Sequence, residues 1–582
     1  MSETIATLKA AWPMLRRAIT SGQLFRPQCE LVDPHPDVEG LYGVDIPMRD
    51  GFALTANIYR SRARTAAGEP SPVVMCAHPY DNRLTPAQKK TPLRGPPQQY
   101  RLIPQAGGVP RFSTLTSWES PDPNFWVRAG YTVVNVNLPG FADSGGPASI
   151  FSAHQGACFR EAIAWAGAQN WSTGAVGLNG VSFLCISQYL AAATPDGEET
   201  PEALKCIVPW EGVSNLYHDL ACRGGVADIG FLNFWWHTEV KEPLNTPLEQ
   251  YLEIEEAIPP EVLDLHPLYD DYWRAKAPPL QNIRVPMLIC ASFSDHELHT
   301  TGTFRAFEQA SSSEKWLYTH RGGKWSEYYS TDALSLQKDF MDRYLKGVSN
   351  RFDKLPPVRL EVRSARDEVK EVRWEKEWPL ANTRYVTLYL QKGKLVPEIP
   401  QKPGEIEFDS RTGRAAFEYL FEADMELSGY MKLKLWAEAR ATRSDDETPK
   451  DLIICAYVQK KDRRGRLVPF NGSVGVSNDV VSRGYGRASR RALNTELSEH
   501  WNPAPSGGKH EPLSIGDIVP LEIALCPSST FFEKGSRLRL IISGQDLFHA
   551  PIFRKVTEVA AHRTVIHFGS EFDTYLLTPQ IP

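Results

Sequence analysis

The sequence predicts a parallel α/β domain that carries a helical insertion and is followed by an all-β domain of jelly-roll type. Up to about residue 350, short apolar strands alternate with helical segments, as in a parallel sheet buried on both faces. Residues 211–280 interrupt this alternation with segments rich in Trp, Tyr and His. After residue 350, period-two strands follow one another without helices, which is typical of antiparallel sandwiches.

The elements of the first domain follow from local patterns. Residues 42–60 read as a hairpin that turns at Asp50-Gly51. A closing helix is expected over 330–347, because Ser330 or Thr331 can cap its start and Gly347 can end it. Between them, apolar runs predict buried strands at 72–78, 131–137, 175–180, 205–210 and 285–292.

These patterns divide the chain into three units. Residues 1–210 hold an N-terminal extension and the first part of the α/β core, and residues 281–350 hold its second part. Residues 211–280 form a helical cap over the carboxyl edge of the sheet, and residues 351–582 form the jelly roll. The stretch 83–123 is proline-rich, and an irregular loop of that length inside a compact domain is more often functional than accidental.

Composition narrows the function classes. The net charge of −6 is mild and no long basic run occurs, so we expect no nucleic-acid partner. No run approaches the roughly 18 apolar residues of a membrane span, so we expect no membrane partner. The nine cysteines are scattered without metal-ligand spacing, which predicts free thiols, no metal site and a reducing compartment. The first residues lack a continuous apolar segment, so we expect a cytoplasmic protein.

Ser182 is the candidate nucleophile. It lies between the apolar strand 175–180 and a helix, and Gly180 permits a sharp turn just before it. A serine hydroxyl is a poor nucleophile until an imidazole accepts its proton and a carboxylate orients that imidazole. In α/β-hydrolases the three residues follow in the order Ser, acid, His, each after a strand of the sheet.

Two residues at later strand ends fit this order. Asp295 follows the strand 285–292, and His320 ends the last strand of the core. His296 and His299 are competing bases, but a side chain so close to the acid in sequence would have to double back to reach Ser182. We therefore expect the triad to consist of Ser182, Asp295 and His320.

An oxyanion formed at Ser182 needs hydrogen-bond donors. The backbone N–H of Phe183 is expected to be one, because the first amides of a helix have no partner within it. The second should come from the loop after strand 72–78, where Tyr80 can offer its hydroxyl and His78 is more simply a buried structural histidine. Cys185, one helical turn after Ser182, is expected to be an inert core thiol.

Aromatic residues of the cap are candidates for the substrate pocket. For each of them alone, packing within a small helical layer is an equally good explanation. The candidates are Phe234, Trp235, Trp236, Tyr269 and Trp273.

The chain resembles the cocaine-esterase and Xaa-Pro dipeptidyl-peptidase family, the CocE/NonD-type α/β-hydrolases. The motifs "IPMRDGFAL", "HPYDN", "WSTGAVGLNGVSFL", "HTTGTFRAFE" and "EKGSRLRLIIS" carry this resemblance, which covers about residues 40 to 545. It implies an α/β-hydrolase core with an inserted helical cap and a C-terminal jelly roll. It also implies Ser182, Asp295 and His320 as the triad, with Tyr80 and the Phe183 amide at the oxyanion.

The chain departs from the family pattern near two of these residues. Phe183 and Cys185 replace the tyrosine and the second glycine that usually follow the nucleophile. The histidine segment "THRGGKW" lacks the Gly-Pro-Trp-x-His form, so the chain resembles a separate branch of the family.

The predicted function is a serine hydrolase that cleaves a small-molecule ester or amide through an acyl-enzyme, without a cofactor. An acyltransferase would use the same triad and pass the acyl group to an alcohol or amine, depending on how well the cap excludes water. The remaining alternative is a non-catalytic binding protein with a hydrolase fold. The complete set of catalytic residue types argues against this alternative. The sequence does not determine the oligomeric state, and a homo-oligomer is possible.

Overall fold

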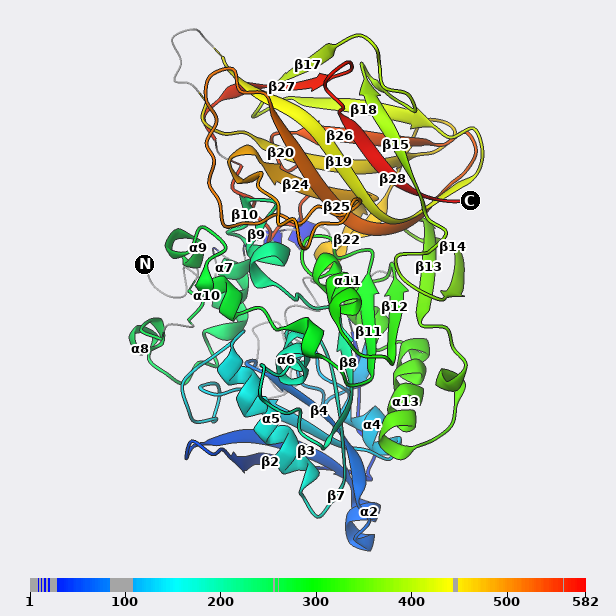
Figure 1. Cartoon of the computed structure of the whole chain (residues 1–582). Coiled ribbons are helices and arrows are strands. Elements are labelled where there is room, and N and C mark those ends of the chain that lie inside the picture. The colour runs from blue at the N-terminus through cyan, green and yellow to red at the C-terminus, as the bar shows by residue number, and fades with distance from the viewer. Residues whose placement is uncertain are drawn as a thin grey trace.

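The computed structural model describes two domains joined end to end (Figure 1). An α/β domain forms the lower part of the view, and an all-β domain, coloured yellow to red, forms the upper part. The structure describes residues 29–83, 108–254, 257–259, 261–442, 449–557 and 559–582, together with Lys9, Trp12, Leu15, Arg16, Ile19 and Thr20. Residues 84–107 of the proline-rich stretch lie outside the described residues.

A mixed sheet organises the first domain. Its first hairpin is antiparallel, as predicted around Asp50-Gly51, and its central strands from β6 to β13 are parallel. These central strands are apolar because helices cover both faces of the sheet. In spatial order the strands are β2 (Val38–Pro47), β3 (Ala53–Ser61), β6 (Thr132–Asn137), β4 (Ser71–His78), β7 (Ser172–Val181), β8 (Leu204–Trp210), β11 (Met287–Ser292), β12 (Lys315–His320), β13 (Val358–Ala365) and β14 (Glu368–Glu375).

Helices connect the parallel strands. The closing helix α13 (Thr331–Lys346) has the predicted caps, with the Ser330 side chain accepting from Ala333 N and Gly347 in the left-handed conformation. The other helices of the core are α2 (Arg62–Ala67), α4 (Pro123–Arg128), α5 (Ala153–Gly167), α6 (Phe183–Ala192), α11 (Thr300–Gln309) and α12 (Lys324–Tyr328). A short ribbon of β1 (Glu30–Val32) and β5 (Arg111–Ser113) lies beside them.

Short helices make up most of the insertion between β8 and β11. They are η2 (Tyr217–Ala221), α7 (Phe231–Trp235), η3 (Trp236–Val240), α8 (Leu248–Leu252), α9 (Val262–Leu265), α10 (Asp271–Ala275) and η4 (Leu280–Asn282). The insertion also contains a small antiparallel ribbon, β9 (Cys222–Arg223) with β10 (Val226–Ala227), which the sequence analysis missed. Strands of two residues are too short to produce a period-two pattern.

The second domain is a sandwich of two antiparallel sheets. One sheet contains β15 (Arg384–Gln391), β28 (Tyr575–Ile581), β19 (Met425–Ala441), β25 (Val519–Phe532), β27 (His562–Phe568) and β17 (Gly404–Asp409). The other contains β18 (Arg414–Leu420), β26 (Arg537–Ser543), β20 (Ile453–Lys461) and β24 (Ser482–Arg487). Their inner faces form a core of their own, to which Leu433, Ile454 and Leu540 belong.

Several smaller elements complete the chain from residue 350 onward. These are η5 (Arg351–Asp353), β16 (Lys394–Val396), β21 (Leu467–Val468), β22 (Phe470–Gly472), η6 (Ser473–Gly475), β23 (Val476–Asp479) and η7 (Ala488–Arg490). Strand β13 follows the predicted boundary at residue 350, yet it extends the core sheet beside β12 and also pairs with β25 at Thr530. Among the described residues, no helix has the length and apolar character needed to cross a bilayer.

Candidate active site

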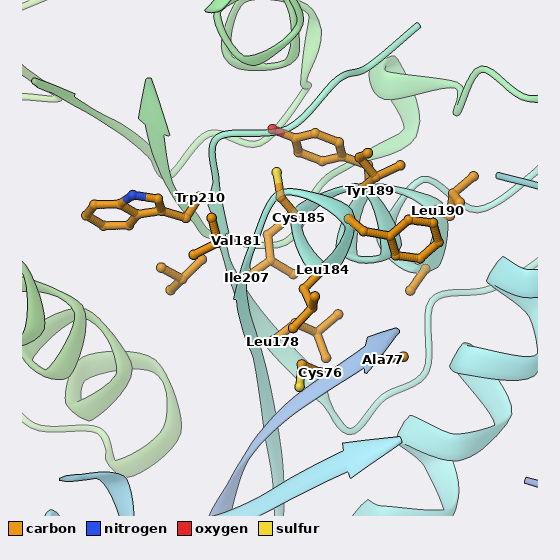
Figure 2. Close-up of a cluster of buried hydrophobic side chains, with 14 of the residues drawn as sticks. Cys76, Ala77, Leu178, Val181, Leu184, Cys185, Tyr189, Leu190, Ile207 and Trp210 are labelled. Atoms are coloured by element: carbon orange, nitrogen blue, oxygen red, sulfur yellow. The ribbon is translucent and has the colours of Figure 1, made fainter. Parts of the chain in front are cut away.

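Ser182 occupies a sharp turn between β7 and α6. Its φ of 59° and ψ of −114° are strained for a residue with a side chain, at a cost of about 1–3 kcal/mol. Its amide donates to the carbonyls of Trp210 and Glu211, both at 3.0 Å, which holds the turn against the end of β8. Helix α6 then packs its apolar face, including Leu184, onto the sheet (Figure 2).

Cys185 belongs to the same packed layer, as predicted. It is fully buried beside Trp210 and Tyr189 in the cluster of Figure 2. Burial raises the pKa of its thiol well above the ordinary value, so the sulfur stays protonated and unreactive.

His299 is the histidine that reaches Ser182. The Ser182 Oγ lies 3.2 Å from His299 Nε2, and His299 Nδ1 lies 2.6 Å from Asp295 Oδ2. Both residues come from the loop between β11 and α11 and are buried. The amides of Leu298, His299 and Thr300 all donate to the Asp295 carbonyl at 3.1 to 3.2 Å, so the chain turns tightly after the acid. This turn is the doubling back that the sequence analysis considered unfavourable.

His320 does not hold the expected place beside the nucleophile. It ends β12, as predicted, but its Nε2 lies 3.0 Å from Glu211 Oε1, and both side chains are buried. Burial disfavours the imidazolium, but the charge and hydrogen bond of Glu211, together with the charges of Glu327 and Glu361, outweigh burial, so the pKa of His320 is raised. The assignment of His320 as the base is therefore corrected. Its ring pairs with Glu211, which directly follows β8, two strands away from β12 in the sheet; the sequence analysis did not consider this partner.

Lys324 is a further residue that sequence reasoning missed. At the start of α12, its Nζ lies 3.1 Å from Asp295 Oδ2 and 2.9 Å from His299 Nδ1. Burial and the Lys324 charge lower the pKa of His299. Burial would raise the pKa of Asp295, but Lys324 and His299 outweigh it and keep the group ionised. The signal for Lys324 was its place in the glycine-rich "RGGKW" segment just after the last parallel strand of the predicted core.

A largely aromatic pocket opens at Ser182. Its cavity volume is about 60 Å³, and it is lined by Trp118, Phe151, Phe183, Phe234, Trp235 and Trp325, among others. Two of the predicted pocket residues, Phe234 and Trp235, are thus in place.

The other three predicted pocket residues pack elsewhere in the cap. Trp236 stacks on Tyr251 with ring centroids 5.2 Å apart. The Tyr269 hydroxyl accepts from Asn215 Nδ2 at 2.9 Å, and Trp273 Nε1 donates to the His266 carbonyl at 2.8 Å. These rings hold the short helices of the cap together. They therefore have the packing role that the sequence analysis gave as the alternative to a place in the substrate pocket.

Tyr80 lines the pocket beside the start of α6. Its hydroxyl oxygen accepts from Trp235 Nε1 at 3.2 Å, so the phenolic proton must be donated in another direction. Burial raises the pKa of Tyr80 well above the ordinary value, which keeps that proton in place. The Tyr80 ring also meets the ring of Phe183 edge to face.

Strained backbone is concentrated around this pocket. Glu119, Phe151, Ser182 and Val474 have positive φ and all line it. Glu119 supports the turn directly, because its carbonyl accepts from Val181 N at 3.1 Å. Its side chain accepts from Trp325 Nε1, and burial raises its pKa to about 8. Residues in such conformations cluster where a fold positions chemistry.

The acid–base residues also form a compact group of possible metal ligands. Among the described residues, Glu211, Asp295 and His299 place one possible ligand atom each within 4.8 Å of one another. Both nitrogens of His299 already have hydrogen-bond partners in Ser182 and Asp295, so the group is better suited to proton transfer than to metal binding.

The fold and the serine turn define an α/β-hydrolase. The model of the X-Pro dipeptidyl-peptidase (S15 family) matches residues 50–323, and that of the X-Pro dipeptidyl-peptidase C-terminal non-catalytic domain matches residues 350–577. A CocE/NonD family hydrolase from Staphylococcus aureus is 33% identical and has a TM-score of 0.82, with 93% of this chain and 94% of that chain covered. The chain therefore belongs to the CocE/NonD family of serine hydrolases, and the predicted fold class is confirmed.

More distant relatives agree with the fold. Cocaine esterase from Rhodococcus sp. is 26% identical over 409 residues, which span 61% of this chain and 63% of the esterase. The structure of an α-amino acid ester hydrolase has a TM-score of 0.63 at 16% identity and covers 94% of this chain and 97% of its own.

Proposed function

We propose that the protein hydrolyses a carboxylic ester or amide through an acyl-enzyme on Ser182, with His299 as general base and Asp295 as the acid that orients it. The observation that supports this most strongly is the unbroken chain from Ser182 Oγ to His299 Nε2 and from His299 Nδ1 to Asp295 Oδ2, at 3.2 and 2.6 Å. A nucleophile, base and orienting acid in this geometry are the requirements of covalent acyl transfer.

The chemistry then follows the hydrogen bonds. His299 Nε2 takes the proton of Ser182 as Oγ attacks the substrate carbonyl carbon, and the ionised Asp295 stabilises the resulting imidazolium. His299 returns the proton to the leaving alcohol or amine, and the acyl group stays on Ser182. Water deprotonated by His299 next attacks the acyl carbon, and the protonated His299 returns that proton to Ser182 Oγ as the acid is released.

The oxyanion would be held by the Phe183 N–H and the Tyr80 hydroxyl. Phe183 is the first residue of α6, so its amide lies at the positive end of the helix. The contact from Trp235 to Tyr80 supports a phenolic O–H directed toward another acceptor. Donors fixed before the substrate binds stabilise the transition state without reorganisation.

The pocket favours substrates with a large apolar group. Trp118, Phe151, Trp235 and Trp325 surround the space beside Ser182, and such rings bind flat apolar surfaces well. We expect aromatic or bulky acyl esters and amides to be better substrates than acetyl ones.

Fluorophosphonate labelling tests this function. The reagent should add covalently to Ser182, as located by peptide mass spectrometry, and Ser182→Ala should abolish both labelling and turnover of an ester and amide panel. A Ser182→Ala protein that retains activity within about tenfold would contradict the proposal, because loss of a triad nucleophile costs about 10⁶-fold in kcat. Cys185→Ala is the matched control and should keep both properties.

A further inference from the structure

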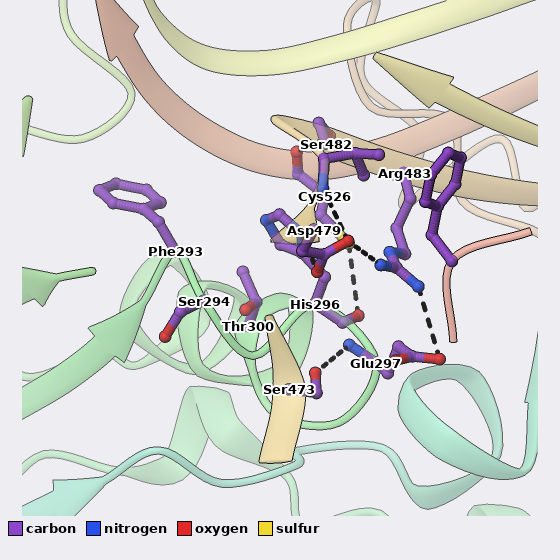
Figure 3. Close-up of polar contacts among 12 residues, drawn as sticks. Phe293, Ser294, His296, Glu297, Thr300, Ser473, Asp479, Ser482, Arg483 and Cys526 are labelled. Carbon is purple, nitrogen blue, oxygen red and sulfur yellow. Dashed lines mark hydrogen bonds and ion pairs between the residues drawn. The ribbon is translucent and has the colours of Figure 1, made fainter. Parts of the chain in front are cut away.

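The loop that carries Asp295 and His299 faces two domains. Asp295 and His299 point toward Ser182, whereas the intervening His296 and Glu297 face the C-terminal domain (Figure 3). All four residues are buried, with at most 3% exposed. The loop is therefore packed between the nucleophile and the sandwich.

Glu297 is bound to the C-terminal domain at three points. Its amide donates to Ser473 Oγ at 2.9 Å, and its Oε2 accepts from Ala550 N at 2.9 Å. Its Oε1 lies 3.5 Å from a terminal nitrogen of Arg483, which also pairs with Asp479. Figure 3 shows the contacts that Ser473 and Arg483 make with Glu297.

The carbonyl of His296 adds two contacts. It accepts from Arg223 of the cap and, at 3.5 Å, from Cys526 Sγ of the sandwich. The His296 ring lies with its Nδ1 3.8 Å from Asp479 Oδ2. Two of the three residues between the acid and the base, His296 and Glu297, are thus bound to groups outside the α/β core.

The Ser473 hydroxyl can donate a further hydrogen bond. Its oxygen accepts from Glu297, so its hydroxyl proton remains to be donated. Among the described residues, Asp295 Oδ1 is a buried acceptor to which no group donates a hydrogen bond. The Ser473 hydroxyl also helps to lower the pKa of Asp295. The next residue, Val474, has a strained φ of 45° and lines the substrate pocket.

We propose that Ser473 of the C-terminal domain is a positioning residue for the triad, holding the Glu297 amide and the Asp295 carboxylate while Arg483 fixes the same loop through Glu297. This inference rests on the proposed function, because it requires Asp295 to orient His299. It gives the sandwich a direct part in the reaction, since small displacements of a catalytic group reduce the rate steeply.

A double-mutant cycle tests the inference in the full-length protein. Ser473→Ala should lower kcat by about tenfold, with KM nearly unchanged, because a hydrogen bond to a charged group is lost away from the pocket surface. On an Asp295→Asn background the same substitution should change kcat by less than about twofold, because residues that act through one another are not additive. Rates are divided by the concentration of sites titrated with a fluorophosphonate, so partial unfolding does not count as lost catalysis.

Ser489→Ala is the matched control. Ser489 is a fully buried serine of the same domain whose hydroxyl donates to Asp451 Oδ2 at 2.7 Å. Among the described residues, its hydrogen bonds go to Asp451 and Glu511, not to the loop 293–299. Its kcat per titrated site should equal that of the parent.

Two results would overturn the positioning role. One is a Ser473→Ala enzyme with parental kcat, and the other is an equal loss of kcat on both backgrounds, which indicates a merely structural serine. An Asp295→Asn enzyme with parental kcat is a different result, because it would contradict the proposed triad itself.

Discussion

At the scale of single residues, Lys324 is expected to set the acid limit of activity. It lies within 3.1 Å of Asp295 and within 2.9 Å of His299, inside a buried site where charges are weakly screened. A general base must be neutral to accept a proton, so the lowered pKa of His299 extends activity toward acid pH.

Lys324→Met should therefore raise the pKa of His299. The acid limb of the profile of kcat/KM against pH should move to higher pH, while the rate on the alkaline side changes less. Lys315→Met is a suitable control, because Lys315 Nζ binds backbone carbonyls of Phe307 and Ala310, away from His299. An unchanged or more acidic limb in Lys324→Met would show that Lys324 does not act on His299.

The two candidate bases can be separated by substitution. His299→Ala should lower kcat by about 10⁴-fold or more, because a triad loses most of its rate with its base. His320→Ala should instead lower the free energy of unfolding by about 3 kcal/mol, because Glu211 is left buried without its partner.

In His320→Ala, kcat per titrated site should stay within about tenfold of the parent at pH values where His299 is neutral. Urea unfolding and active-site titration measure the two effects separately. The reverse ranking of the two variants in kcat would restore His320 as the base.

At the scale of elements, the turn from β7 into α6 depends on Gly180. Its φ is 149°, and an added Cβ would lie 2.5 Å from the Cβ of Leu184. Gly174, on the same strand, also has positive φ, but nothing lies within 4 Å of its Cβ position. Replacing Gly174 by alanine therefore tests backbone strain alone, whereas replacing Gly180 tests backbone strain together with a steric clash.

Gly174→Ala should cost about 1 kcal/mol of stability from strain alone and leave kcat unchanged. Gly180→Ala should cost about 3 kcal/mol and also lower kcat, because the start of α6 must move away from Ser182. Denaturant midpoints and kcat per titrated site provide the comparison. Equal effects of the two substitutions would show that the contact with Leu184 does not control the turn.

At the scale of the whole molecule, the two domains share structure. Strand β13 pairs with β12 of the core and with β25 of the sandwich, and Glu297 of the core is bound by Ser473 and Ala550. Unfolding of either domain would leave these buried groups of the other without partners.

We therefore expect one cooperative unfolding transition. Far-UV circular dichroism and tryptophan fluorescence should give coincident midpoints in urea. Two separated transitions, with the active site lost in the first, would show that the shared strand and loop contribute little coupling. Ser473→Ala, which leaves the β13 pairing and the Ala550 contact in place, should lower the midpoint without separating the two probes.

Much of this arrangement could be predicted from local sequence patterns. Buried strands, the caps of α13 and the glycine before Ser182 act over a few residues, so their signals lie close together in the chain. The positions of Ser182 and Asp295 followed from strand ends, because the carboxyl ends of parallel strands meet at one edge of the sheet.

The choice of the base was decided only by tertiary structure. His299 reaches Ser182 because three amides converge on the Asp295 carbonyl. His320 pairs instead with Glu211, which follows β8, two strands away from β12 in the sheet. Lys324 approaches Asp295 from α12, and Ser473 of the other domain binds the Glu297 amide of the same loop. Contacts between side chains far apart in sequence depend on how strands are ordered and how loops turn. The sequence by itself therefore determined which residue types stand at the edge of the sheet, and only the folded chain determined which of them touch.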